Sequence, residues 1–357
     1  MLTNRPNDLE QLLRPVWDGN TIYEESFFAL MQPDETEEQE LIIPLLYRPD
    51  RILSVTSATR TAVMEEGVDY VLRDGALVIL PVSAVKRMQW DEYQVLDGDS
   101  AQYPIGFEGE GGGRLFFGEG DTMHSRQYLV SYTHSDTWED YIPVKQSGCL
   151  PRTGALLAEG KPISLCWFGD SITTGANSSG AIGAEPYIPA FPQLVSMALE
   201  SRFGSSITYH NHAVGGTGSA WGCEQLPIVF ADAKPDVMFI GFGMNDGYCP
   251  PAEIVGNIRR MVDQTLALNP ECEFLICATT LPNTLAMGFY ANQIEHEPLL
   301  AELCRELGPR AALVPMTSVH AALLKKKRFY DMSGNNVNHP CDFLARVYAQ
   351  VILAQIV

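Results

Sequence analysis

The sequence is short of positive charge. Its 357 residues carry 24 Lys and Arg against 44 Asp and Glu, which gives a formal net charge of −20. Proteins that bind nucleic acids take much of their affinity from basic side chains that neutralise phosphates. Anionic membrane surfaces attract basic segments for the same reason. We therefore expect neither a nucleic acid nor a membrane as a partner.

Long apolar runs and paired cysteines are also lacking. No segment approaches the ~18 consecutive apolar residues of a membrane span, and the N-terminus lacks the basic start and apolar stretch of a signal peptide. The eight cysteines are too sparse for a disulfide scaffold and form no CxxC pair, so buried free thiols are favoured over disulfides or a zinc site. These absences predict a soluble, cytoplasmic protein.

The chain has two parts that differ in net charge and in the pattern of their apolar residues. Residues 1–150 carry 26 acidic and 11 basic side chains, a net charge of −15, and the remaining residues carry −5. The first part has short alternating or β-branched runs, and Asp74-Gly75 between two of them is a hairpin signal, because such turns need positive φ. We predict a β-rich, β-sandwich-like (jelly-roll) accessory domain over residues 1–155.

Residues 156–357 show an alternation of strand and helix patterns. Short apolar runs typical of buried parallel strands alternate with amphipathic segments of helical spacing. The expected strands are 163–168, 207–213, 237–242, 274–279 and 312–315, and the expected helices are 191–203, 252–268, 294–307 and 341–356. This order predicts an α/β/α sandwich, in which a site lies at the carboxyl ends of the strands.

Residues suited to acyl transfer follow these strands. Ser171 follows the first strand, Gly216 lies in a glycine-rich turn after the second, Asn245 follows the third, and His339 precedes the last helix. A serine hydroxyl is a weak nucleophile until a base such as histidine takes its proton. Fixed N–H donors must then stabilise the oxyanion, and the Ser171 and Gly216 amides and the Asn245 side chain are candidates.

These four blocks resemble the SGNH (GDSL-type) hydrolases over roughly residues 160–357. The serine, glycine, asparagine and histidine of that family correspond to Ser171, Gly216, Asn245 and His339. The resemblance implies a flavodoxin-like α/β/α fold and esterase or lipase activity without a metal or other cofactor.

One position departs from the family pattern. The family usually has an aspartate three residues before its histidine, where this chain has Asn336. An amide can orient the imidazole but cannot stabilise the imidazolium as a carboxylate does. The His339 ring could instead donate a hydrogen bond to a backbone carbonyl, which gives a Ser–His dyad, or to the carboxylate of Asp331 or Asp342. We favour the dyad, since Asp342 opens the last helix, where an acidic residue stabilises the N-terminus.

A β-rich domain before an SGNH domain without this aspartate resembles certain two-domain carbohydrate acetyl esterases. This similarity implies a short acyl ester, such as an acetylated oligosaccharide or a small molecule, as the substrate. The alternatives are a lipase or thioesterase acting on lipid-like esters and a catalytically silent carbohydrate-binding protein. Asp170, Tyr187, Trp221 and Tyr248 are candidates for substrate binding, although such aromatics are more often structural. The sequence does not determine the oligomeric state.

Three other patterns have weaker functional interpretations. The Gly216-Thr217-Gly218 turn resembles a dinucleotide-binding turn, but its spacing to Gly222 is wrong and Asp236 precedes its strand. His210 and His212 share one face of a strand but lack a nearby third metal ligand. The basic run 325–328 could be a nuclear signal or a polyanion patch, and we interpret it as a solvated face.

Overall fold

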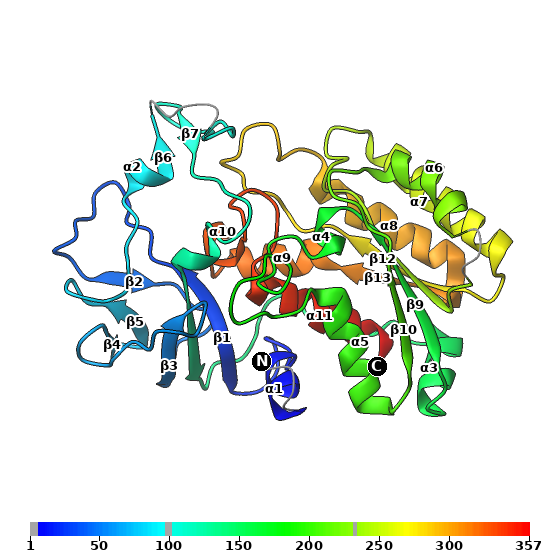
Figure 1. Cartoon of the computed structure of the whole chain (residues 1–357), viewed down its shortest axis with the longest axis horizontal. Helices are drawn as coiled ribbons and strands as arrows, with labels where there is room; N and C mark the ends of the chain where they lie inside the picture. The colour runs from blue at the N-terminus through cyan, green and yellow to red at the C-terminus, as the bar shows by residue number, and fades with distance from the viewer. Residues whose placement is uncertain (1–5, 97–101, 231–233) are drawn as a thin grey trace.

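A computed structural model describes residues 6–96, 102–230 and 234–357 (Figure 1). The N-terminal part contains antiparallel strands, as predicted. Its described strands form two three-stranded sheets, β1-β8-β3 and β2-β5-β4, and the two-stranded ribbon β6-β7. This arrangement differs from a jelly roll, in which eight strands form two sheets. The elements are α1 (Pro6–Leu12), β1 (Thr21–Phe28), β2 (Leu41–Ile43), β3 (Arg51–Ser57), β4 (Tyr70–Arg73), β5 (Ala76–Ile79), α2 (Trp90–Tyr93), β6 (Gln94–Val95), β7 (Arg114–Leu115), η2 (His124–Arg126) and β8 (Gln127–Thr133).

The predicted hairpin at Asp74-Gly75 is present. Strands β4 and β5 pair with Arg73 opposite Ala76, and both turn residues have positive φ, 52° for Asp74 and 72° for Gly75. These angles match the right-handed twist of the paired strands, which explains the preference for Asp-Gly at this turn.

The C-terminal part is an α/β/α sandwich around a five-stranded parallel sheet. The strand order β10-β9-β11-β12-β13 is the flavodoxin-like order, so that prediction is confirmed. Its elements are α3 (Pro151–Ala158), β9 (Ile163–Gly169), α4 (Ser171–Thr174), α5 (Phe191–Phe203), β10 (Ile207–Asn211), α6 (Ser219–Val229), β11 (Val237–Gly241), α7 (Pro251–Leu268), β12 (Glu273–Ala278), α8 (Gln293–Leu307), η3 (Gly308–Arg310), β13 (Ala311–Pro315), α9 (Met316–Leu324), α10 (Phe329–Met332) and α11 (Asp342–Ile356).

Two apolar layers hold the helices against this sheet. Side chains of α6, α7 and α8 pack on one face around Phe168 and Phe242, and those of α5 and α11 pack on the other around Trp167 and Phe239. Residues of β9, β11, β12 and β13 are buried on both faces, which explains their continuous apolar runs. The edge strand β10 has three exposed residues out of five. No helix within the described ranges is long and apolar enough to cross a membrane.

The boundary predicted between residues 155 and 156 lies inside helix α3. This helix contacts β9 and α5, and the Glu273 carboxylate accepts hydrogen bonds from its first amides, Arg152 N–H at 2.9 Å and Thr153 N–H at 2.7 Å. A carboxylate is favourable at a helix N-terminus because it meets unpaired N–H groups and the positive end of the helix dipole. Helix α3 therefore belongs to the C-terminal domain, and we place the boundary before Pro151.

The basic run 325–328 joins the two domains. Lys327 forms a fully buried ion pair with Glu25 of β1 at 2.7 Å. Lys325 binds Asp140 at 2.6 Å, and the Lys326 ammonium lies 5.6 Å from the centre of the Trp138 ring. The interpretation of this run as a solvated face is therefore wrong for Lys327, which is fully buried, and holds for Lys325, whose side chain is 66% exposed.

Candidate active site

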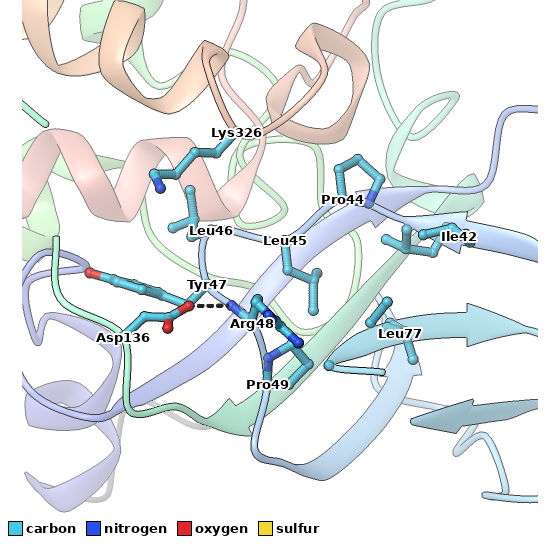
Figure 2. A pocket seen from close by; sticks show the side chains of 13 residues that line it. Ile42, Pro44, Leu45, Leu46, Tyr47, Arg48, Pro49, Leu77, Asp136 and Lys326 are labelled. Carbon is cyan, nitrogen blue, oxygen red and sulfur yellow. Dashed lines mark hydrogen bonds between the residues drawn. The ribbon is translucent and has the colours of Figure 1, made fainter. Parts of the chain in front are cut away.

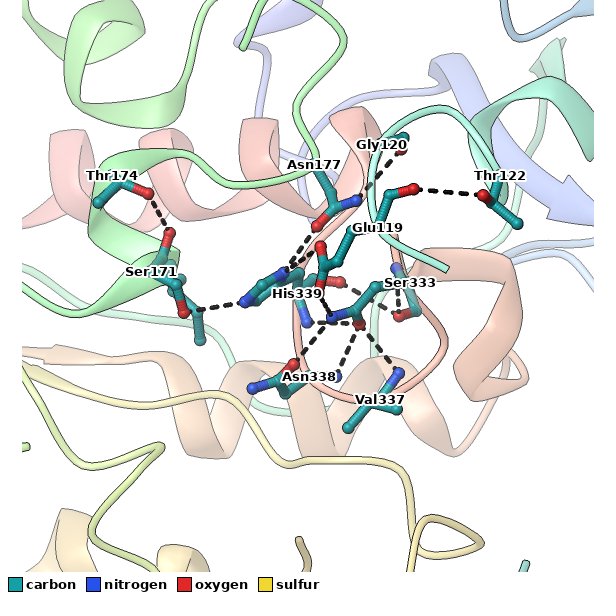
Figure 3. Close-up of polar contacts among 12 residues, drawn as sticks. Glu119, Gly120, Thr122, Ser171, Thr174, Asn177, Ser333, Val337, Asn338 and His339 are labelled. Carbon is teal, nitrogen blue, oxygen red and sulfur yellow. Dashed lines mark hydrogen bonds and ion pairs between the residues drawn. The ribbon is translucent and has the colours of Figure 1, made fainter. Parts of the chain in front are cut away.

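Ser171 and His339 meet at the carboxyl ends of the strands. Ser171 is the first residue of α4, separated from the end of β9 by Asp170 alone, and His339 lies in the loop before α11. The Ser171 Oγ lies 2.8 Å from the His339 Nε2 (Figure 3). A nucleophile and a base within hydrogen-bond reach are the arrangement that activates a serine.

Asp170 fixes the start of the helix that carries the nucleophile. Its side chain is buried, and its Oδ1 accepts a hydrogen bond from Ile172 N–H at 2.9 Å, which fixes the start of α4. Burial raises the pKa of Asp170 to about 7. Asp170 is only 1% exposed, so its side chain supports the turn that carries Ser171, and its role in substrate binding stays a prediction.

The loop that carries His339 is organised by Asn335. Its Oδ1 accepts hydrogen bonds from three backbone N–H groups, those of Val337, Asn338 and His339, each at 3.0 Å. Its Nδ2 donates to Asn338 Oδ1 and to Glu119 Oε1, both at 3.0 Å. A loop of irregular backbone thereby has its N–H groups paired and the histidine backbone fixed.

The other ring nitrogen of His339 faces two acceptors. Its Nδ1 lies 2.6 Å from Asn177 Oδ1 and 3.3 Å from Glu119 Oε2 (Figure 3). The Asn177 Nδ2 donates to the Gly120 carbonyl at 3.2 Å, so the oxygen of this amide faces the ring. The Nδ1 therefore carries the proton in the neutral ring, and Nε2 is free to accept the proton of Ser171.

Glu119 is held as a carboxylate. Burial alone would raise the pKa of Glu119, but hydrogen bonds with His339, Asn335 and Asn177 outweigh that effect and hold the pKa below its usual range. Its side chain remains about half exposed, at 54%. The group is thus ionised and open to solvent on one side.

The three residues expected to orient His339 have other partners. Asn336 accepts a hydrogen bond from Tyr93 Oη at 3.2 Å and donates to the Phe116 carbonyl at 2.8 Å. Asp331 accepts from Phe28 N–H at 2.9 Å, and Asp342 accepts from Ser179 N–H at 2.8 Å. None of them hydrogen-bonds the imidazole within the described chain. The acceptor nearest to Nδ1 is the side-chain amide of Asn177, where the dyad hypothesis expected a backbone carbonyl.

Asn177, Glu119 and Asn335 were missed in the sequence. Asn177 has a left-handed backbone (φ 64°), which asparagine tolerates better than most residues, and this gives only a local turn signal. Glu119 stands between two glycines 220 residues before His339, a separation over which no local pattern predicts contact.

The candidate oxyanion donors lie on neighbouring turns. A Cβ placed on Gly215 would be 3.6 Å from the Ser171 Cβ, so the glycine turn passes beside the nucleophile. Gly216 is exposed with φ 75°, and the Asn245 Nδ2 donates to the Thr217 carbonyl at 2.9 Å. These contacts bring Ser171, the glycine turn and Asn245 together as the strand order predicts.

Asp246 fixes the two turns to each other. Its carboxylate accepts hydrogen bonds from the N–H and hydroxyl groups of Ser219, both at 2.8 Å, at the start of α6. A Cβ on Gly218 would come 2.8 Å from the Asp246 Oδ1, so only glycine permits this approach. The residue that follows Asn245 thus anchors the turn that contains Gly216.

The candidate aromatic residues have different surroundings. Trp221 packs against Phe168 and Phe242 with ring centroids 5.7 and 6.4 Å apart, which is a structural role rather than a place in a pocket. Tyr187 is 50% exposed and Tyr248 is 70% exposed, so both rings are accessible.

The weaker motifs have structural partners. The rings of His210 and His212 stack 6.1 Å apart, and no cluster of three or more His, Cys, Asp and Glu suited to a metal occurs among the described residues. Asp236 accepts from Ser164 N–H at 2.8 Å at the amino end of the sheet, away from the glycine turn.

A separate hollow of about 320 Å³ lies against the N-terminal domain. It is lined by strand and loop residues around Leu46 and Leu77, together with Asp136 and Lys326 (Figure 2). None of its lining residues belongs to the group around Ser171.

Comparisons with known proteins complete this description. Residues 167–342 match the model of the GDSL-like Lipase/Acylhydrolase family, and no curated protein matches the chain. A solved two-domain esterase (CEX) active on acetylated mannans is 19% identical with a TM-score of 0.47, over 58% of this chain and about half (53%) of that one. A catalytic mutant of Axe2, an acetylxylan esterase from Geobacillus stearothermophilus, is 16% identical with a TM-score of 0.46, over 55% of this chain and 95% of that one. TesA is 23% identical with a TM-score of 0.42, over 53% and 96%.

Proposed function

Residues 167–342 make this chain a member of the GDSL-like lipase/acylhydrolase family and a serine ester hydrolase, and from this premise we propose that it removes acetyl and other short acyl groups from carbohydrate esters. The observation that carries the catalytic part of this proposal is the 2.8 Å contact between Ser171 Oγ and His339 Nε2, with the opposite ring nitrogen already engaged.

The reaction proceeds in two acyl transfers. His339 Nε2 takes the Ser171 proton as Oγ attacks the ester carbonyl, and the same proton then passes to the departing alcohol when the acyl-enzyme forms. Water repeats the sequence: His339 deprotonates it, the acyl–Oγ bond breaks, and Ser171 recovers its proton as the acid leaves. No cofactor takes part in these proton transfers.

The oxyanion of each tetrahedral intermediate is stabilised by three donors. We assign them to the backbone N–H groups of Ser171 and Gly216 and to the Asn245 side chain, one of whose N–H bonds already holds the Thr217 carbonyl. The loss of one such donor typically costs about 3–4 kcal/mol of barrier. Asn245→Ala should therefore reduce kcat by about 10²- to 10³-fold.

The preference for short acyl groups on sugars is supported by the polar surroundings of Ser171. Glu119 and Asn177 contact the far nitrogen of His339, and the exposed glycine turn passes beside Ser171, so polar groups surround the catalytic pair. The accessible rings of Tyr187 and Tyr248 suit the apolar face of a sugar ring.

Hydrolysis of an aryl acetate by the parent and by Ser171→Ala tests the catalytic assignment. The parent should be active, and the variant should lose at least about 10⁴-fold in kcat. Equal activity of the two proteins, or inertness of the parent toward several acyl esters, would refute it.

Acyl-chain length tests the substrate class. The ratio of kcat/KM for acetyl over octanoyl esters should be well above one, and acetylated oligosaccharides should be deacetylated. Comparable values for the two chain lengths would favour a lipase- or thioesterase-type enzyme instead.

A further inference from the structure

We propose that the N-terminal domain completes the catalytic apparatus: Asn177 orients His339, and Glu119, from the N-terminal domain, supplies the negative charge that stabilises its imidazolium form. In this arrangement the two tasks of a single acidic residue are divided between two side chains. The proposal rests on the proposed function, because it concerns the base of that same reaction.

The need for a charge follows from the contact that Asn177 makes. Its Oδ1 is the nearer acceptor, 2.6 Å from the His339 Nδ1, and it fixes the ring and its tautomer. A neutral amide, however, offers little compensation for the positive charge that the ring acquires when it takes the Ser171 proton. The carboxylate of Glu119, with Oε2 3.3 Å from the same nitrogen, provides that compensation.

Other acidic groups near the ring are less well placed. Asp170 lies on the nucleophile side, where its carboxyl is committed to Ile172 N–H in a fully buried position. Asp342, three residues after His339, is buried and holds Ser179 N–H. Among the described residues, Glu119 is the carboxylate that lies within 3.3 Å of an imidazole nitrogen, and the contact becomes an ion pair when the ring takes up the Ser171 proton.

The loop that carries Glu119 is attached to the C-terminal domain at Glu119 itself and at residues that follow it. Asn335 Nδ2 donates to Glu119 Oε1. Asn177 Nδ2 donates to the carbonyl of Gly120 (Figure 3). Five residues after Glu119, the Nε2 of His124 lies 2.6 Å from the carbonyl oxygen of Glu185. The carboxylate is therefore held in place by residues of the same two segments that hold the ring.

Glu119 acts without receiving a proton. The proton of Ser171 moves to Nε2 and later leaves from Nε2, while Nδ1 keeps its own proton between Asn177 and Glu119 throughout. Glu119 is therefore a positioning residue that acts through His339, and its removal should affect the chemical step rather than substrate binding.

The test compares Glu119→Gln with Asp121→Asn in the full-length chain. The first change keeps the shape of the side chain and removes its charge, and the second removes a charge from an exposed position two residues away on the same loop. Glu119→Gln should lower kcat for an aryl acetate by about tenfold, with KM within twofold of the parent, because a half-exposed charged contact is weakened by solvent. Asp121→Asn should keep the parental kcat.

The pH profile separates this role from a structural one. The acidic limb of the kcat/KM profile should move to lower pH in Glu119→Gln, because the protonated ring loses a neighbouring negative charge. Asp170 and Asp342 are unchanged in the variant, so their contribution to the profile cancels in the comparison. A merely structural defect would lower the whole profile without moving this limb.

Two results would overturn the proposal. One is a parental kcat and an unmoved acidic limb in Glu119→Gln, and the other is an equal loss in Asp121→Asn. Ser171→Ala in the same assay keeps the two hypotheses apart. If that variant is inactive while Glu119→Gln behaves as the parent, the esterase proposal stands and the role of Glu119 falls.

Discussion

Two of the contacts between the N-terminal domain and the C-terminal domain have opposite environments. Lys327 and Glu25 are fully buried and 2.7 Å apart, and the Glu25 carboxylate also accepts hydrogen bonds from Leu46 N–H and Tyr132 Oη. His339 and Glu119 meet at 3.3 Å, with the Glu119 side chain half exposed. The first contact lies in the core between the domains and the second at the edge of the catalytic site.

This difference separates stability from chemistry. A buried ion pair contributes little net stability, yet the removal of one partner is costly because the other charge stays buried without compensation. A half-exposed pair contributes little to stability because water screens it. Its charge can nevertheless act on a group whose own charge changes during a reaction. Of these two contacts, the buried one is thus costly to break, and the half-exposed one is the contact that we assign to the reaction.

The largest effect is expected at the buried pair. Lys327→Met should lower the free energy of unfolding by about 3–5 kcal/mol, because it leaves the Glu25 carboxylate buried without a cation. Urea denaturation of this variant and of the double variant Glu25→Gln/Lys327→Met measures the effect. The double variant should recover most of the loss, and a loss under about 1 kcal/mol in the single variant would contradict the assignment.

Within the described ranges, the buried carboxyl of Asp170 has no cationic side chain among its hydrogen-bond partners, and its contribution to the free energy of unfolding should depend on pH. Its pKa, raised from 3.8 to about 7 by burial, means that the folded state binds its proton more tightly than the unfolded state. Stability from this group is therefore complete below about pH 4 and is lost as pH rises through 7, by about 4 kcal/mol. Denaturation of the parent and Asp170→Asn between pH 4 and 8 should show a flatter curve for the variant. Parallel curves would contradict the raised pKa.

The hydrogen bonds of Asn336 form a neutral contact between the domains, and their removal shows how much such a contact contributes to stability compared with the buried ion pair. Asn336→Ala leaves Tyr93 Oη and the Phe116 carbonyl without their buried partner, which should cost about 2–3 kcal/mol of unfolding free energy. Activity at a temperature where the variant is folded should fall far less than in His339→Ala. Equal losses of activity in the two variants would show that Asn336 serves the reaction directly.

The smallest change in stability is expected at the half-exposed pair. Glu119→Gln should alter the free energy of unfolding by only about 0.5 kcal/mol, because solvent screens the contact and the amide retains much of the hydrogen bonding. Its thermal unfolding should overlay that of the parent. A loss comparable to that of Lys327→Met would remove the distinction between the two contacts.

The sequence predicts the parallel sheet and the order of its site residues well, because both depend on local patterns. Ser171, the Gly216 turn and Asn245 each follow a buried apolar run, and parallel strands bring their carboxyl ends to one edge. The surroundings of His339 were less accessible to such reasoning. Asn336 occupies the family position by sequence, but the path of the loop aims it at Tyr93 rather than at the ring.

The basic run 325–328 is a second place where local sequence patterns do not predict the contacts of the side chains. Four consecutive charges indicate a solvated face when neighbours are unknown, and only the docking of β1 reveals the buried partner of Lys327. Contacts between domains depend on how the surfaces of two domains pack together, and this packing cannot be predicted from the composition of either segment.

The side chain of Asn335 has a consequence for how this protein can change in evolution. Its oxygen accepts three N–H groups and its nitrogen donates to Glu119, so an amide is required: a carboxylate would serve the three donors but repel Glu119. Positions 119 and 335 lie 216 residues apart and in different domains, yet neither is free to alter its charge alone. Among homologous chains we expect the two positions to co-vary, with aspartate at 335 accompanied by the loss of the acid at 119.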